Sequence, residues 1–145
     1  MNILLIFIWV YAAMISASFW EAYSEGRNCW DKGKIGWKLK LGKYTFTGYH
    51  FFLFFMMFPI LLSLPLVIYG WDTRLFGILL SAYLTGLVVE DFFWFIVNPA
   101  IRFKEDFSPK FASYYPWIKI WRINIPSGYP LLVFFAFLSW AFLWR

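Results

Sequence analysis

The sequence predicts an all-α integral membrane protein: a four-transmembrane-helix bundle with an interfacial cytoplasmic connection. Of its 145 residues, 62% are hydrophobic and only 14% are charged, whereas soluble domains are roughly half apolar and about a quarter charged. The apolar residues gather in four segments, and the basic residues gather in two of the connections between them. We therefore predict a single polytopic membrane domain over 1–145, with spans at about 3–23, 49–69, 74–97 and 127–144.

The first three segments approach or exceed the roughly 20 residues that cross about 30 Å of hydrocarbon. The first lacks the basic start of a secretory signal, and bulky Phe19 and Trp20 follow its small residues, so we expect a retained helix. The fourth segment is shorter and spans only without tilt, with local thinning, or with a start inside the NIPSGYP stretch at 124–130, the alternative being a re-entrant or interfacial segment. Pro59 and Pro65 predict a bent or locally opened second helix, whose freed carbonyl groups need partners.

The distribution of lysine and arginine predicts the orientation. With four spans, the first and third connections share one side, and they hold every basic residue except Arg74 and Arg145. The positive-inside rule makes that side the cytoplasm, so both termini are expected outside. The net charge of +5 then reflects topology and attraction to anionic headgroups, and no nucleic-acid partner is expected. Cys29 is the single cysteine, which excludes an intrachain disulfide.

The two long connections are typical of membrane surfaces. The first contains an alternating run over 37–41, which suits a strand or extended segment. The third, 98–128, alternates aromatic with charged residues and is expected to lie in the cytoplasmic interface, as an anchor or as a lid over the helices. Binding of lipid phosphate is the alternative to simple anchoring. The candidate lipid-headgroup residues are Lys38, Lys40, Lys43, Lys119 and Arg122.

Ionisable side chains inside the apolar segments are the most informative feature, because each costs at least a few kcal/mol in a bilayer. Glu21 and Glu25 end the first segment, and His50 begins the second. Glu90 and Asp91 lie near the end of the third. Because the chain direction alternates, we expect these groups to meet in the cytoplasmic half of the membrane.

Helical spacing predicts which of these groups face other helices. Small residues and carboxylates recur every four residues on two helices: Ala13, Ala17, Glu21 and Glu25 on the first, and Ala82, Gly86 and Glu90 on the third. Small residues at this spacing allow helices to approach closely, so Glu21 and Glu90 are expected at helix contacts. Asp91 lies about 100° around the helix from Glu90. We expect it to pair elsewhere, for instance with a tyrosine, tryptophan or backbone N–H of the third connection.

Three hypotheses explain how the acids are stabilised. In the first they bind a divalent metal ion, because carboxylates with one imidazole suit Mn, Fe, Zn or Mg. The candidate metal residues are Glu21, Glu25, His50, Glu90 and Asp91. In the second the acids form ion pairs with charged His50 and with Arg27 or Lys43. In the third they stay protonated and serve proton or cation movement. A bundle di-iron centre is disfavoured because the chain has no Glu-x-x-His pair.

The predicted function is that of a small polytopic membrane protein, a binding or accessory subunit built around the acidic and histidine cluster near the cytoplasmic face. The alternative is a membrane-embedded, metal-dependent enzyme acting on a lipid or other apolar substrate. Neither a nucleophile triad nor a phosphate loop supports another chemistry. The expected partners are membrane lipids and further copies of the chain or other membrane subunits, because four short helices bury little of their own surface.

Overall fold

The computed structural model describes residues 1–30, 35–42 and 44–145, and most of these residues are helical. The helices are α1 (Ile3–Glu25), α2 (Gly48–His50), α3 (Phe58–Tyr69), α4 (Thr73–Val97), α5 (Phe103–Asp106) and α6 (Gly128–Ser139). Two π-helical stretches complete them: Phe51–Met57 joins α2 to α3, and Trp140–Trp144 extends α6. Two antiparallel hairpins pair β1 (Lys38–Leu41) with β2 (Tyr44–Thr47) and β3 (Trp117–Ile120) with β4 (Ile123–Pro126).

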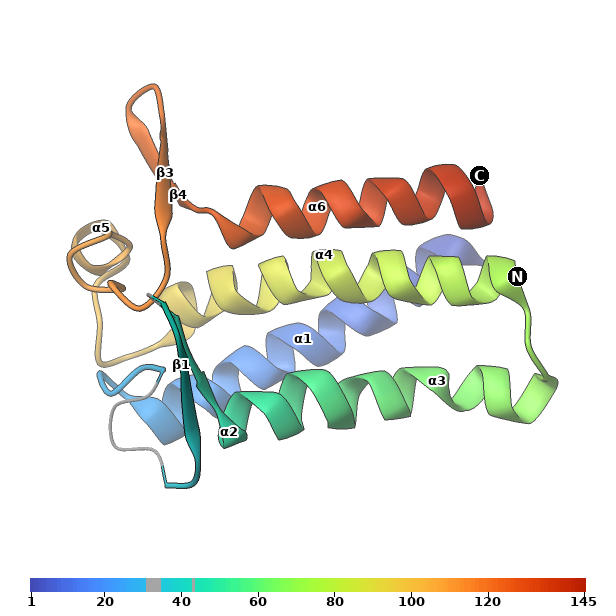
Figure 1. The fold of residues 1–145 in the computed structure, drawn as a ribbon, viewed down its shortest axis with the longest axis horizontal. Helices are drawn as coiled ribbons and strands as arrows, with labels where there is room; N and C mark the ends of the chain where they lie inside the picture. Colours follow the sequence, from blue (N-terminus) through green and yellow to red (C-terminus); the bar gives the residue numbers. More distant parts are fainter. Residues whose placement is uncertain (31–34, 43) are drawn as a thin grey trace.

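The long helices α1, α3, α4 and α6 form an elongated bundle (Figure 1). Helix α4 is its centre, because it packs against α1, α3 and α6. Both termini and the turn between α3 and α4 lie at one end of the bundle, whereas the two hairpins and α5 lie at the other (Figure 1). We call the latter the hairpin end.

Three helices are long and apolar enough to cross a membrane: Ile3–Glu25, Gly48–Tyr69 and Thr73–Val97. The prediction of a mostly helical protein is thereby confirmed, and the three candidate spans agree with a multi-pass membrane protein. The predicted fourth span is not confirmed, because the last helical segment has only 12 residues in α6 and 5 in the following π-helical stretch. At about 1.5 Å of rise per residue it reaches roughly 25 Å, less than the roughly 30 Å of a hydrocarbon core.

The second spanning segment is opened just before Pro59, as its prolines predict. In the π-helical stretch each N–H bonds to the carbonyl five residues earlier, as Phe58 does to Leu53. Proline has no N–H, so Pro59 leaves the Phe54 carbonyl without its partner in this pattern. The hydroxyl of Tyr83 on α4 donates to that carbonyl. A neighbouring helix therefore supplies the hydrogen bond that the proline removes.

Helices α1 and α4 approach closely through small residues on α4. A Cβ atom at Gly86 would lie 3.0 Å from Cγ of Met14, and Ala82 is fully buried against the same methionine. The predicted small-residue stripe is therefore confirmed on α4, but it is wrong on α1. Ala13 is exposed, and Met14 and Ser18 lie on the buried face instead. Residues spaced by three and by four both share a helix face with Glu21, so spacing alone did not choose between them.

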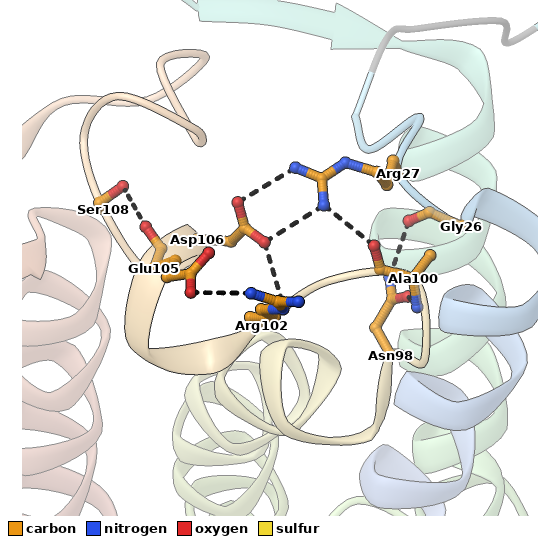
Figure 2. Close-up of polar contacts among 8 residues, drawn as sticks. All are labelled: Gly26, Arg27, Asn98, Ala100, Arg102, Glu105, Asp106 and Ser108. Carbon is orange, nitrogen blue, oxygen red and sulfur yellow. Dashed lines mark hydrogen bonds and ion pairs between the residues drawn. The ribbon is translucent and has the colours of Figure 1, made fainter.

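A polar bridge joins the ends of α1 and α4 at the hairpin end (Figure 2). Asn98, the residue that caps α4, donates from Nδ2 to the Gly26 carbonyl at 2.8 Å. Its Oδ1 accepts from the Ala100 N–H at 2.9 Å. Asn98 is only 3% exposed, so this bridge fixes the relative position of the two helix ends that carry the acids.

The alternating run in the first connection forms a strand, β1, as predicted. The third connection contains a second hairpin that the sequence analysis missed. Its signal was the alternation of isoleucine with polar residues on both sides of a short turn: Ile118, Ile120, Ile123 and Ile125. The turn places Trp121 at a φ of 54°, a region that non-glycine residues seldom adopt.

Candidate metal centre

Helix α1 supplies two acids one turn apart. Glu21 and Glu25 are 5% and 7% exposed, and both lie on the face of α1 that is buried in the bundle. Their spacing of four residues aligns them along that face. The Gly26 carbonyl that follows Glu25 accepts from Asn98, so the helix end that carries both acids is held against α4.

His50 is positioned by the cap of its own helix. The Oγ1 atom of Thr47 accepts from the backbone N–H of His50 at 3.3 Å and lies 2.6 Å from Nδ1 of its ring. Thr47 and His50 are 1% and 4% exposed. Because Thr47 engages Nδ1, Nε2 is the ring nitrogen that would bind a metal ion, as in metal-bound histidines whose other nitrogen is hydrogen-bonded. Sequence reasoning missed Thr47, although a threonine three residues before a helical residue is a cap signal.

An aromatic stack encloses the imidazole. The ring of Trp30 stacks on that of His50 at 4.0 Å and 27°, and it also stacks on Tyr114 at 5.2 Å and 4°. Phe54 stacks on His50 at 6.2 Å and 18°. Trp30 has a φ of 61° and donates from its indole N–H to the Thr45 carbonyl, so the backbone and a hydrogen bond both fix this ring. The stack orients His50 and covers it against water.

Helix α4 supplies the remaining acids. Glu90 is 4% exposed, and its carboxyl group lies near that of Glu21 in the lining of one cavity. Asp91 accepts a hydrogen bond of 2.5 Å from the hydroxyl of Tyr129, at the start of α6. The sequence predicted such a tyrosine partner for Asp91, and Tyr129 lies directly beyond the connection in which it was expected.

All five candidate metal residues line one small cavity of about 40 Å³ near the hairpin end. Its lining residues are Glu21, Glu25, Trp30, His50, Phe54, Glu90, Asp91, Trp94 and Tyr114. One ligand atom from each of Glu21, Glu25 and His50 lies within 4.8 Å of the other two. A cavity of this size has room for one ion or a very few waters. The expectation that acids from separate spans meet the histidine is fulfilled in this space.

Three atoms of the cavity wall are buried without a hydrogen-bond partner among the described residues. They are Oε1 of Glu21, Oε1 of Glu90 and Nε1 of Trp94. Buried polar atoms are normally paired, and leaving one unpaired costs about 1–3 kcal/mol. Two of these atoms are acceptors that suit a cation. The third is an N–H donor that suits an oxygen atom bound beside it.

Arg27 does not pair with the cavity acids, which corrects one of the ion-pair predictions. Its guanidinium donates to both carboxylate oxygens of Asp106, at 3.2 and 3.3 Å, and to the Ala100 carbonyl at 3.0 Å (Figure 2). The Arg102 backbone N–H and Arg27 together hold the pKa of Asp106 below its usual value. Arg27 follows Glu25 by only two residues in the sequence. However, α1 ends at Glu25, and the loop that follows directs the Arg27 side chain toward α5. Lys43, the other predicted partner, lies outside the described residues.

The described candidate headgroup residues do not line this cavity. Lys38 and Lys40 are exposed on β1, Lys119 is exposed on β3, and Arg122 occupies the tip of its hairpin. The guanidinium carbon of Arg122 is 5.3 Å from the ring centre of Trp121. These cations are therefore displayed at the hairpin end of the bundle and form no part of the acidic site.

Comparisons with protein-family models, with curated protein sequences and with solved structures find no match for this chain. The centre is defined by its own residues: three potential ligands, two further acids and an aromatic enclosure. Trp30 and Trp94 were missed by sequence reasoning, because an aromatic side chain in an aromatic-rich chain carries no distinguishing signal, whereas Tyr114 belongs to the connection that was expected as an anchor or a lid. Their place beside the acids depends on loops whose path the sequence pattern does not specify.

Proposed function

We propose that this protein binds one divalent metal ion inside its membrane bundle, through Glu21, Glu25 and His50. The observation that carries this proposal is the proximity of the three ligand atoms, within 4.8 Å of one another in a buried cavity. Two carboxylates and one imidazole form a donor set suited to Zn, Mn or Fe. Three protein ligands leave a coordination position for water or substrate, which is characteristic of catalytic metal sites.

A cation also explains how the acids are tolerated. Four carboxyl groups line the cavity, and no lysine or arginine lies among its described lining residues. A buried acceptor left without a hydrogen bond, as Oε1 of Glu21 and Oε1 of Glu90 are among the described residues, costs about 1–3 kcal/mol. The ion-pair hypothesis loses one of its cations, since Arg27 is engaged by Asp106. One divalent ion at the point where the acids converge would provide a partner for Oε1 of Glu21 and Oε1 of Glu90.

The same centre suits either a metal-dependent enzyme or a metal-binding accessory subunit, and the arrangement of Glu90 favours the enzyme. Glu90 contacts the ligand Glu21 and lies beside the cavity without belonging to the three-ligand group. A carboxylate placed beside a metal-bound water is suited to act as a general base. The activity we propose is therefore metal-assisted chemistry on a lipid or another apolar substrate.

The proposed orientation puts the hairpin end toward the cytoplasm. Exposed Lys38, Lys40, Lys119 and Arg122 all lie in the two hairpins at that end, and basic loops are retained on the cytoplasmic side of membranes. The metal centre then lies near the cytoplasmic surface. A reagent that labels lysine from only one side of sealed vesicles tests this orientation.

Elemental analysis of the detergent-purified protein tests metal binding directly. We expect close to one divalent ion per wild-type chain after dialysis against a weak chelator, and a large loss of metal in Glu25→Gln. The matched control is Glu105→Gln, because Glu105 is an exposed acid at the same end that pairs with Arg102 at 3.2 Å. Metal-free, well-folded wild-type protein, or equal metal in Glu25→Gln, would contradict the proposal.

Proton binding is a second candidate function, favoured by the contact between the carboxyl groups of Glu21 and Glu90. Two neighbouring carboxyl groups can share a proton when no cation lies between them. On this hypothesis Glu90→Gln keeps the contact, and purified wild-type protein holds no metal. The same elemental analysis, with Glu90→Gln included, separates the two functions.

A further inference from the structure

One wall separates the metal cavity from a second and larger space. The wall is the segment that runs from α2 into the π-helical stretch. His50 and Phe54 line the metal cavity, whereas their neighbours Tyr49 and Leu53 line the other space. The two spaces are therefore back to back along one turn of helix. A π-helical stretch is uncommon and occurs often at functional sites, and here it forms this shared wall.

Helix α1 completes the wall with a second pair of neighbours. Glu21 lines the metal cavity and Trp20 lines the larger space. The rings of Trp20 and Tyr49 stack at 5.8 Å and 17°, and the hydroxyl group of Tyr49 is in contact with the carboxyl group of Glu21. Tyr49 is thus the residue that touches both spaces: its ring faces one, and its hydroxyl reaches a proposed metal ligand of the other.

The larger space is an apolar groove of about 750 Å³. Its lining includes Trp20, Trp37, Tyr49, Phe52, Met56 and Ile60. Phe52, Met56 and Ile60 are 60%, 40% and 55% exposed, and they belong to a helix that is long and apolar enough to cross a membrane. The groove therefore opens toward the hydrocarbon of the bilayer, so a hydrocarbon chain is the ligand that its surroundings supply.

The length of the groove matches one leaflet. From Tyr49 to Ile60 the helix rises at most about 16 Å, the length at the α-helical rise of about 1.5 Å per residue, and half of a hydrocarbon core is about 15 Å. Trp37 closes the groove at the hairpin end, where its indole packs directly on Gly48: a Cβ atom there would lie 2.9 Å from Nε1 of Trp37. Lys38 and Lys40 follow Trp37 on exposed β1. An anionic headgroup at the membrane surface thus meets positive charge where the groove begins.

We infer that this groove holds one acyl chain of a membrane glycerophospholipid, with its ester region at Tyr49 and its phosphate near the lysines of β1. The inference rests on the proposed function, because it names the substrate class of the metal centre. The lipid lies along the groove from the headgroup level to the middle of the bilayer. The ester carbonyl oxygens of the lipid are then separated from Glu21 by the side chain of Tyr49. Movement of that side chain connects the ester region to the metal cavity.

Retention of lipid through detergent extraction tests the inference. The protein is reconstituted into vesicles of phosphatidylcholine and phosphatidylglycerol, extracted with mild detergent and weighed intact by native mass spectrometry. The variants Met56→Trp and Ile60→Trp fill the groove at its middle and at its inner end. The matched control is Leu61→Trp, because Leu61 is 52% exposed beside Ile60 but does not line the groove.

We expect one retained phospholipid per chain in the wild type and in Leu61→Trp. Occupancy should fall about tenfold or more in both groove variants, which corresponds to roughly 1.4 kcal/mol. Equal retention in the wild type and in the two groove variants, or no retained lipid in the wild type, would overturn the inference. Metal content is measured on the same preparations. Metal without retained lipid refutes only the groove, whereas retained lipid without metal refutes only the metal centre.

Discussion

The contact between α1 and α4 has two halves that differ in what they bury. Toward the chain termini, Met14 packs on Gly86 and Ala82 in a close apolar contact. Toward the hairpin end, Glu21 of the same helix meets Glu90 across a cavity of about 40 Å³. Both halves follow one helical period, so the period decides only which face is buried. Whether that face packs tightly or leaves a polar space depends on the residues that occupy it.

This difference assigns separate tasks to the two halves. The close apolar half gains its stability from dispersion between well-packed atoms, which is the main attraction between helices in lipid. The polar half gives up such contacts and buries acids that destabilise the bundle unless a ligand compensates for them. Stability in the first half should therefore be insensitive to metal, whereas stability in the second should depend on it.

The largest expected effect is stabilisation of the polar half by metal. At a free metal concentration of about 1,000 times the dissociation constant, binding to the folded state alone adds about 4 kcal/mol to the free energy of unfolding. We expect this gain in the wild type and its loss in His50→Gln, which removes a ligand but keeps a polar side chain. Unfolding in mixed micelles with and without zinc or manganese measures it. An equal gain in both proteins would place the ion elsewhere.

The next largest effect is expected from a substitution that disrupts packing in the apolar half. In Gly86→Val the added carbons meet Met14, because even a Cβ atom would lie 3.0 Å from its Cγ. Overpacking of this kind costs about 1–3 kcal/mol. Gly128→Val is the control, since a Cβ atom there has nothing within 4 Å, and we expect it to change stability by less than about 0.5 kcal/mol. Metal content should stay unchanged in both variants. Loss of metal in Gly86→Val would show that packing in the apolar half affects metal binding in the polar half.

A smaller effect concerns the orientation of His50. Thr47→Val removes the hydroxyl that lies 2.6 Å from Nδ1 while it keeps the shape of the side chain. Loss of such a partner lowers metal affinity about 10- to 100-fold. Competition with a chelating dye measures the affinity, and Thr73→Val is the control because Thr73 accepts a hydrogen bond from Trp71 at the opposite end of the bundle. Unchanged affinity in Thr47→Val would show that Thr47 serves only as a helix cap.

The smallest effect lies outside both halves, at the ion pair of Arg27 with Asp106. The folded state lowers the pKa of Asp106 from its ordinary value of 3.8, so its stabilisation is present above that value and is lost as pH falls through the lowered one. Because Arg27 is more than half exposed, we expect less than about 1 kcal/mol. The difference in unfolding free energy between the wild type and Asp106→Asn should shrink on acidification. A difference that grows in acid would contradict this sign.

Much of the candidate site was predictable because it lies on long helices. Apolar runs mark the spanning segments, and their alternating direction brings Glu21, His50 and Glu90 to one end of the bundle. Proline chemistry also predicted a locally opened second helix. The buried face of α1 was not predictable, since Ala13 and Met14 each have a helical spacing from Glu21 that allows contact. Arg27 was misassigned because its direction depends on a loop.

Apolar length and helical period are properties of the chain alone, and they account for the three helices long enough to cross a membrane and for the meeting of the acids with one histidine. The packing of distant segments sets the face that α1 presents, with Met14 and Ser18, and it places Trp30 on His50 and Arg27 against Asp106. These outcomes depend on contacts between segments far apart in the chain. Such contacts depend on the complementary shapes of the packed surfaces and on the pairing of buried polar groups. Neither produces a periodic pattern in the sequence.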